Sequence, residues 1–206
     1  MMAESAGAQA VSVCTPFFIK PSDEELLDHY TAIAKSTRLP VLLYNNPGRT
    51  GVNLSAEIVV QAAKVDNIIG IKDSSGDMTL TAEYIRRTDE SFAVLAGKDT
   101  LIYGTLAYGG RGAIAATANV APKLVVEIYD AFMVGDYKRA LAAQYRLAPL
   151  RLAFEFGTFP VVIKEALNMI GIEAGYAARP VGTISGAKRE ELKEILKQMG
   201  LLHETW

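Results

Sequence analysis

Lys72 lies at the end of a short apolar run, Ile68-Ile69-Gly70-Ile71, and a polar, glycine-containing turn follows it. Runs of this length that are rich in β-branched residues are typical of strands buried on both faces. Because side chains alternate along a strand, Lys72 should share a face with Ile68 and Gly70. An amine deprived of water favours its neutral form, which can attack a carbonyl and form a Schiff base. The alternative is a lysine that extends from the strand end into solvent.

A tyrosine and an arginine that could act with such a lysine follow an earlier apolar run. Tyr44 lies near the end of the run 40–46, and Arg49 lies in the glycine-containing segment 47–51, which reads as a loop. A phenol both donates and accepts a hydrogen bond, so it can relay protons. A guanidinium binds a carboxylate through two parallel hydrogen bonds. The alternatives are a core aromatic residue with a satisfied hydroxyl and an ordinary surface arginine.

These residues must be positioned by the alternating elements that the sequence predicts. Strands are expected at residues 10–17, 40–46, 68–72, 92–97 and 112–118. Helices are expected at residues 1–6, from Ser22 onward, and at 55–64, 78–87 and 99–106. Ser22 and Glu25 have the spacing of a capping box. Strands that alternate with helices in this way predict repeated βαβ units and a parallel sheet.

Polar residues at the carboxyl ends of successive strands decide between two parallel architectures. A dinucleotide-binding sheet should carry a G-x-G-x-x-G turn after its first strand, and this sequence has none. Thr15, Tyr44, Lys72 and Asp99 instead lie at or just after strand ends, where a barrel enzyme builds its site. We therefore predict an α/β fold of the (β/α)8 TIM-barrel type. The barrel is expected to be incomplete, because a full one takes about 250 residues and eight βα units.

The pattern changes to helices alone from Pro122 onward. These helices are expected at residues 122–134, 136–148, 160–170 and 187–199. No linker-like or low-complexity segment separates them from the strands. We predict that residues 1–120 form the partial barrel and that residues 121–206 form a C-terminal helical region packed on it.

The composition argues against several other classes of protein. A net charge of −2 over 206 residues gives no electrostatic reason to expect a nucleic acid or an anionic membrane as partner. No stretch reaches the roughly 18 apolar residues of a membrane span. The single cysteine, Cys14, leaves no internal disulfide and fits a reducing cytoplasm. With that cysteine and only His29 and His203 as soft ligands, we predict no metal site.

Three motifs lie at or near strand ends with spacings found together in one enzyme family. They are YNNPGRTG at residues 44–51, GIKDSSGD at 70–77 and GGRGAIAATANV at 109–120. With them, the chain resembles the dihydrodipicolinate synthase / N-acetylneuraminate lyase family of pyruvate-dependent class I aldolases. The resemblance covers essentially the whole chain but only the later part of the family, so the strands would be equivalent to strands 4–8. It implies that the first three βα units, with a Gly-Thr-Thr-Gly-Glu loop that binds the pyruvate carboxylate, are absent.

The resemblance also implies roles for individual residues. Lys72 would form the Schiff base, Tyr44 would relay protons near the substrate carboxylate, and Arg49 would bind a carboxylate. The positions expected to line the substrate pocket, for which a purely structural role is as good, are Thr15, Gly97 and Ile114. Asp73 and Asp77 are expected to be charges at the start of a helix rather than catalytic acids.

Phe17 and Phe18 depart from the family pattern. Synthases of this family usually carry two tyrosines here, and the second reaches across a subunit interface to complete a hydroxyl relay. Phe18 cannot donate or accept a proton. The pair would instead contribute apolar contact area at an interface, and the resemblance implies a homo-oligomer, either a dimer or a tetramer.

The favoured function is a lysine-biosynthetic lyase of the dihydrodipicolinate synthase type that condenses pyruvate with an aldehyde. The covalent Schiff base through Lys72 would make a metal or a dissociable cofactor unnecessary. Arg49 favours this branch. Phe18 favours the alternative, a lyase that releases pyruvate from a 2-keto-3-deoxy sugar acid or an N-acetylneuraminate-type substrate. A second alternative is a truncated, catalytically incompetent member acting as an interaction module, because an unclosed barrel leaves exposed strand edges.

Overall fold

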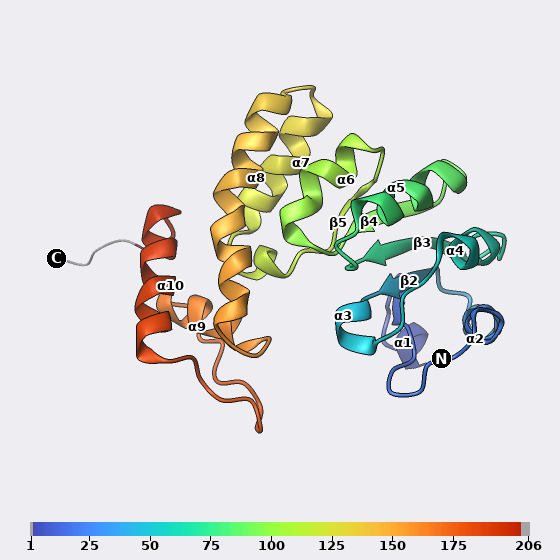
Figure 1. The fold of residues 1–206 in the computed structure, drawn as a ribbon, viewed down its shortest axis with the longest axis horizontal. Coiled ribbons are helices and arrows are strands. Elements are labelled where there is room, and N and C mark those ends of the chain that lie inside the picture. The colour runs from blue at the N-terminus through green and yellow to red at the C-terminus, as the bar shows by residue number, and fades with distance from the viewer. Residues whose placement is uncertain (1, 203–206) are drawn as a thin grey trace. The chain divides into compact units, whose positions relative to one another are not determined.

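The computed structural model describes residues 2–202 and contains two compact units, Met1–Ile114 and Ala115–Trp206 (Figure 1). Met1 and His203, which entered the sequence analysis, lie outside the described residues. Within residues 2–202, no helix is long and apolar enough to cross a membrane. The predicted boundary at residue 120 and the predicted packing of the helical region on the barrel stay predictions.

The first unit is built around a five-stranded parallel sheet with the order β1-β2-β3-β4-β5 (Figure 1). The strands are β1 (Val11–Cys14), β2 (Val41–Asn45), β3 (Ile68–Asp73), β4 (Ala93–Ala96) and β5 (Gly112–Ala113). Strands that follow each other in the chain are neighbours in the sheet, as repeated βαβ units require. The predicted α/β fold with a parallel sheet is therefore confirmed.

Helices precede and connect the strands of this sheet. They are α1 (Met2–Ser5), α2 (Asp23–Lys35), α3 (Pro47–Thr50), α4 (Ala56–Ala62), α5 (Met78–Arg87), the 3-10 turn η1 (Asp99–Leu101) and α6 (Ile102–Ala107). The predicted capping box at the start of α2 is confirmed. The Ser22 hydroxyl accepts a hydrogen bond from Glu25 N, and the Glu25 carboxylate accepts one from Ser22 N. Local side-chain chemistry therefore sets where this helix begins.

One face of the sheet is covered by helices, and the other is partly open. Val41, Leu43 and Ile71 are buried in a core that also contains side chains of α2, α4 and α5. Along β2 and β4 every second side chain is only half-buried. The prediction that β3 is buried on both faces is wrong, because Ile69 is 39% exposed and Lys72 is half-buried.

A register shift between β2 and β3 also changes which side chains share a face with Lys72. Lys72 pairs with Tyr44 and Gly70 pairs with Leu42, whereas Ile68 pairs with Val41 of the covered face. Lys72 therefore shares a face with Gly70 as predicted, but not with Ile68, which is buried in the core.

The strand predicted at residues 112–118 is much shorter than expected. Its ladder ends where Ile114 N donates to Ala96 O, because Ala96 is the last residue of β4. Ala116–Asn119 then forms a 3-10 helix, η2, through bonds such as that from Val120 N to Thr117 O. After Ile114, the alanine-rich residues have no large β-branched side chain and little reason to stay extended.

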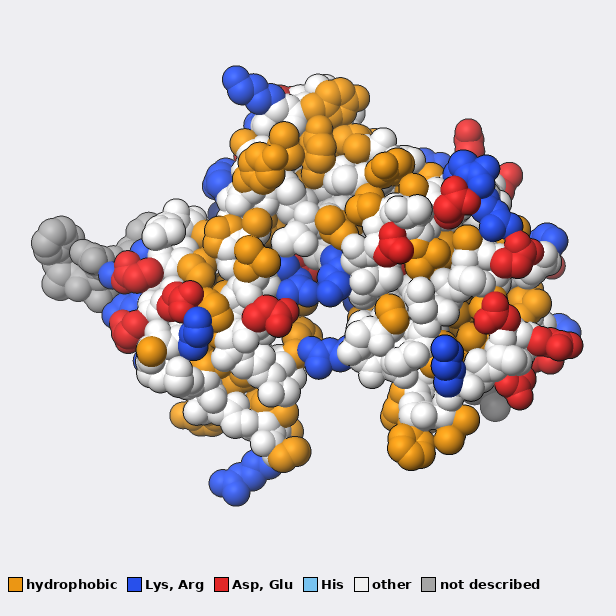
Figure 2. Space-filling model, in the orientation of Figure 1, with side chains coloured by type: hydrophobic (Ala, Val, Ile, Leu, Met, Phe, Trp, Pro, Cys, Tyr) orange, Lys and Arg blue, Asp and Glu red, His pale blue; other side chains and the backbone are white. Residues whose placement is uncertain are grey.

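Among residues 115–202, the second unit contains helices and no strand, as predicted from Pro122 onward. After η2 come α7 (Pro122–Met133), α8 (Tyr137–Leu152), the 3-10 helix η3 (Ala153–Phe156), α9 (Val161–Met169) and α10 (Gly186–Gln198). Helix α8 continues past Pro149, one turn beyond its predicted end. Apolar side chains gather on the surface over α7 and α8 (Figure 2), and the exposed ones include Val126, Met133, Val134, Tyr137 and Tyr145.

Candidate active site

The carboxyl ends of the first four strands bring the predicted catalytic residues together. In register, Cys14 pairs with Tyr44, Tyr44 with Lys72, and Lys72 with Leu95. Registered residues of parallel neighbours point to the same side of a sheet. Tyr44 and Lys72 are therefore adjacent on the open face, and both are half-buried.

Lys72 and Tyr44 are in direct contact. The Lys72 Nζ lies 4.1 Å from the centroid of the Tyr44 ring. This cation–π geometry holds the amine against an aromatic surface. A nucleophilic amine and a phenol thus share one location at the end of the sheet, although their catalytic roles stay predictions.

The Tyr44 hydroxyl has a second neighbour, Asn46. Asn46 Nδ2 donates a hydrogen bond of 2.9 Å to the Tyr44 hydroxyl oxygen. Asn46 is the residue before α3, and its carbonyl accepts from the backbone N–H groups of Arg49 and Thr50. The phenol is thereby fixed on one side by the amide and on the other by its packing against Lys72.

Arg49 lies on a single helical turn, α3, where the sequence predicted a loop. Pro47 occupies the first helical position, and Gly51 ends the turn with a φ of 73°, in the left-handed region that glycine adopts easily. The Arg49 side chain is exposed on this turn. Its proposed contact with a substrate carboxylate stays a prediction.

Thr15, the residue after β1, fixes that turn. Its side chain is 1% exposed, and its hydroxyl donates to the Thr50 hydroxyl at 2.8 Å. The Thr50 hydroxyl oxygen lies 3.2 Å from Asn46 O and 3.1 Å from Val52 O, and it accepts from Val52 N. Thr15 thus supports the turn that carries Arg49, and its predicted contact with substrate stays a prediction.

Gly97 and Ile114 mark the ends of β4 and β5. Gly97 N donates to Asp73 O at 2.7 Å, and a Cβ at Gly97 would lie 2.1 Å from Ser74 Oγ. Only glycine therefore allows the turn after β3 to approach β4 this closely. Ile114 is 40% exposed and bonds through its backbone to Ala96. For both positions, pocket lining stays a prediction.

A buried polar cluster behind these residues was missed by the sequence analysis. Asp73 is 4% exposed and accepts hydrogen bonds from Asn45 Nδ2 (3.1 Å) and the Thr81 hydroxyl (2.6 Å). It also accepts from the backbone N–H and the hydroxyl of Ser75, both at 2.9 Å. The prediction that Asp73 lies at the start of a helix is therefore wrong, because its carboxylate is held by this buried cluster. Asp77 does lie at a helix start, as predicted, because it caps α5 by accepting from Thr79 N and Leu80 N.

Asn45 and Tyr84 complete this cluster. Asn45 Nδ2 also contacts Asn53 Oδ1 (2.9 Å) and the Tyr84 hydroxyl (3.2 Å), and Asn45 Oδ1 accepts from Leu54 N (3.0 Å). The Tyr84 hydroxyl donates to Leu54 O. Burial, and then the charges of Asp73 and Asp77, raise the pKa of Tyr84 above its ordinary value. Tyr84 is therefore a proton donor to the backbone rather than an acid–base group.

Strand alternation is the signal that could have found this cluster. Asn45 and Asp73 each come one position after a predicted catalytic residue, so they must point to the covered face. Two polar side chains buried on neighbouring strands need hydrogen-bond partners.

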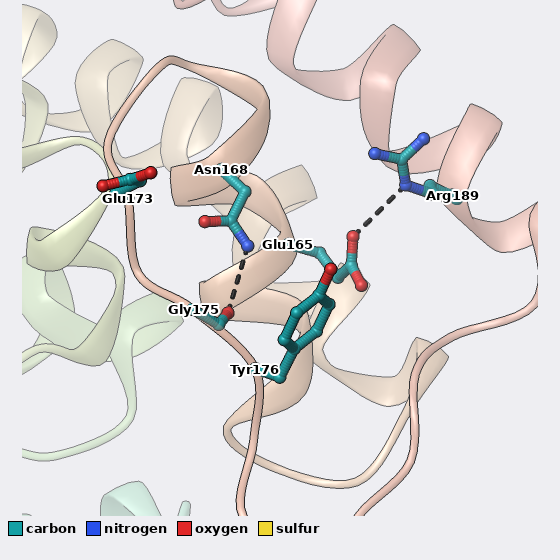
Figure 3. Close-up of a pocket in the computed structure, with 6 residues that line it drawn as sticks. All are labelled: Glu165, Asn168, Glu173, Gly175, Tyr176 and Arg189. Carbon is teal, nitrogen blue, oxygen red and sulfur yellow. Dashed lines mark hydrogen bonds and ion pairs between the residues drawn. The ribbon is translucent and has the colours of Figure 1, made fainter.

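A polar cavity of about 580 Å³ in the second unit has a different character (Figure 3). Its polar side chains are mostly bonded to one another or to nearby backbone. Arg189 Nε lies 3.2 Å from Glu165 Oε2, and Asn168 binds both Gly175 O and Ala174 N. These bonds hold the segment after α9 in place, and none of the predicted catalytic residues lines the cavity. Among residues 2–202, no cluster of three or more acidic, histidine or cysteine side chains is placed to hold a metal ion.

Comparison with known proteins gives a consistent result. The model of the "Dihydrodipicolinate synthetase family" matches residues 1–199. A 4-hydroxy-tetrahydrodipicolinate synthase of Archaeoglobus fulgidus is 41% identical over 199 residues, which are 97% of this chain and 69% of that protein.

Solved structures agree with the sequence matches. The crystal structure of dihydrodipicolinate synthase from Thermotoga maritima has a TM-score of 0.94 and 35% identity, covering 98% of this chain and 70% of that one. A dihydrodipicolinate synthase from Acinetobacter baumannii, complexed with pyruvate, has a TM-score of 0.93 and 34% identity, covering 97% of this chain and 69% of that one.

Proposed function

Because this chain belongs to the dihydrodipicolinate synthetase family, we propose that it is a Schiff-base lyase of the 4-hydroxy-tetrahydrodipicolinate synthase type, which serves lysine biosynthesis by condensing pyruvate with an aldehyde. The single observation that carries the proposal is the contact between Lys72 Nζ and the Tyr44 ring at the carboxyl end of the parallel sheet. An amine and a phenol in this arrangement suit imine formation at a ketone.

The chemistry follows from these two groups. Lys72 attacks the ketone carbon of pyruvate, water leaves, and an iminium ion forms. Loss of a proton from the pyruvate methyl group gives an enamine, which adds to the aldehyde carbon, and water then releases the product from Lys72. Tyr44 moves the protons, and Arg49 binds a carboxylate through its guanidinium. The iminium is itself the electron sink, so this route uses no metal or dissociable cofactor.

The open face of the sheet is proposed to be the inner face of an incomplete (β/α)8 barrel. Its half-buried side chains include Leu42, Tyr44, Lys72 and Leu95. In a barrel, side chains of this face fill the interior, and the reacting groups lie at the carboxyl ends of the strands. Gly97 and Ile114 then line the pocket beside Lys72, and Thr15 lines it from β1. The single cysteine fits a cytoplasmic location.

The homo-oligomer, a dimer or a tetramer, is proposed from the loop after β1. Phe17 and Phe18 are 75% and 93% exposed, and Phe18 has a φ of 74°, which is strained for a residue with a side chain. Exposed aromatic side chains held in this way suit an apolar contact with a second copy. Light scattering of the purified chain and of Phe18→Ser tests this, with a lower mass expected for the variant.

Phe18 also favours a second candidate function, a lyase that releases pyruvate from a 2-keto-3-deoxy sugar acid. It has no hydroxyl with which to extend a proton relay from Tyr44. Two assays separate the candidates. Condensation activity consumes pyruvate in the presence of an aldehyde, whereas lyase activity produces pyruvate from the keto acid alone.

Reductive trapping tests the common core of both candidates. The chain is incubated with pyruvate and borohydride, and the modified residue is located by mass spectrometry. A stable adduct is expected on Lys72, absent in Lys72→Ala and unchanged in the matched variant Lys64→Ala. Lys64 is exposed, binds Gln61 and lies before the start of β3, whereas Lys72 lies near the carboxyl end of that strand. A folded protein without the adduct would refute the proposal and favour an interaction module.

A further inference from the structure

Asn46 uses its side chain in an unusual way. It occupies the position before α3, where asparagine is one of the preferred capping residues. However, its side chain makes no capping hydrogen bond to this turn. Its Nδ2 instead donates to the Tyr44 hydroxyl at 2.9 Å. The Asn46 amide therefore binds the Tyr44 hydroxyl and does not cap α3.

We propose that Asn46 is a positioning residue that orients the Tyr44 hydroxyl for proton donation, an inference that rests on the proposed Schiff-base function. A phenol has one proton, and its oxygen here accepts from the amide of Asn46. The proton must then point away from Asn46. The Lys72 Nζ lies 4.1 Å from the centroid of the Tyr44 ring, so a carbinolamine formed on Lys72 would lie beside this phenol.

The consequence concerns the loss of water during imine formation. Attack of Lys72 on a 2-keto acid gives a carbinolamine. Tyr44 transfers its proton to the carbinolamine hydroxyl, the C–O bond breaks, and water leaves. The nitrogen lone pair then forms the C=N bond of the iminium ion. Tyr44 remains as a phenolate, and the Asn46 N–H stabilises this anion more strongly than it stabilises the neutral phenol.

Two substitutions separate this role from a helix-capping role. Asn46→Ala removes both the donor and the capping ability. Asn46→Asp keeps a good capping residue, since aspartate and asparagine are about equally preferred there. It replaces the donor with an acceptor and adds a negative charge beside Tyr44. A capping role predicts that Asn46→Asp behaves like the parent, whereas the orienting role predicts that it is worse than Asn46→Ala.

The first measurement is the rate of adduct formation on Lys72 at several pyruvate concentrations, from borohydride quenching at increasing times. Asn46→Ala is expected to lower the maximal rate about tenfold, the worth of one hydrogen bond, with little change in half-saturation. Asn46→Asp is expected to lower it further. Asn119→Ala, in which a surface amide that binds Ala116 O is lost, is the matched control and should equal the parent.

The second measurement needs no substrate. The Tyr44 ring carbon that bears the hydroxyl is observed by 13C NMR during a pH titration and assigned with Tyr44→Phe. In Asn46→Asp, the Tyr44 resonance should change at a higher pH than in the parent, because the phenolate would face a carboxylate. Titration at the same pH in the parent and both variants would overturn the inference, as would parent-like rates in Asn46→Asp.

The two measurements also distinguish the two levels of proposal. A parent chain that forms no adduct on Lys72 refutes the Schiff-base function, and the role of Asn46 that rests on it falls as well. A parent that forms the adduct, with variants that form it equally fast, refutes the role of Asn46 alone.

Discussion

The two faces of the sheet differ most sharply at the carboxyl ends of β2 and β3. On the covered face, Asn45 and Asp73 are 0% and 4% exposed, and several hydrogen bonds within the protein hold each of them. On the open face, Tyr44 and Lys72 are half-buried and contact each other. Asn45 directly follows Tyr44 in the chain and Asp73 directly follows Lys72, yet the surroundings of the two faces have little in common.

The difference follows from the alternation of side chains along a strand. One position further along the chain moves a side chain from the open face to the covered face. The covered pair ties β2 and β3 to α5 and to the segment after α3, and so fixes the strand ends on which the open pair stands. Residues of the covered pair therefore hold the strand ends, and residues of the open pair are proposed to react. Mutations in the covered pair should mainly lower stability, and mutations in the open pair should mainly lower the rate of adduct formation.

Asp73→Ala should have the largest effect on stability. It removes the acceptor of the Ser75 N–H and one of the two or more acceptors of the Thr81 hydroxyl and the Asn45 amide, which keep Asp77 O and Asn53 Oδ1. A donor left without a partner costs about 1–3 kcal/mol and each other lost hydrogen bond about 1 kcal/mol, so we expect a total loss of about 3 kcal/mol in the free energy of unfolding. Urea denaturation followed by circular dichroism measures it.

The control for Asp73→Ala is Asp28→Ala, at an exposed position of α2. It should change the free energy of unfolding by about 0.5 kcal/mol or less. Equal losses in the two variants would remove the proposed distinction between the faces.

Tyr44→Phe tests the open face and should have the opposite profile. The ring that packs against Lys72 remains, so the free energy of unfolding should stay within about 0.5 kcal/mol of the parent. The rate of adduct formation on Lys72 should fall about 100-fold, because a general acid is removed. A large loss of stability with an unchanged trapping rate would show that Tyr44 belongs to the support rather than to the chemistry.

Much of the arrangement follows from local sequence signals. The apolar runs and the helix caps at Ser22, Ser55 and Asp77 predict the order of elements, and α5 has the predicted bounds. The strand-end positions of Tyr44 and Lys72 predict that they are neighbours, and the register confirms it. These signals are short in range, and physical rules connect them directly to backbone conformation.

Other features depend on contacts between distant segments. The register shift that separates Ile68 from the face of Lys72 arises from pairing with β2 and leaves no mark in the sequence of β3. The early end of β5 is set by where β4 ends. The Tyr84 hydroxyl accepts a hydrogen bond from Asn45, which lies 39 positions earlier in the chain. The local sequence around either residue therefore does not predict this contact.

The smallest effect is expected in the free energy of unfolding at alkaline pH. It distinguishes the buried tyrosines of the covered face from exposed tyrosines. Burial raises the pKa of Tyr84 and of Tyr30 in the folded chain. Their contribution to stability is therefore fully present below about pH 10, the ordinary value of an unfolded tyrosine, and is lost as the pH rises above it.

Each such group contributes a decline of up to about 1.4 kcal/mol per pH unit in the free energy of unfolding. Tyr84→Phe, which also loses the bond to Leu54 O at neutral pH, should show a shallower decline above pH 10 than the parent. Tyr145→Phe, at a 68% exposed position, should keep the parental slope. Urea denaturation at pH 9 to 11 measures the slopes. Parallel slopes in all three proteins would mean that the Tyr84 phenol releases its proton as readily in the folded chain as in the unfolded one, and that the covered face does not hold it as a donor.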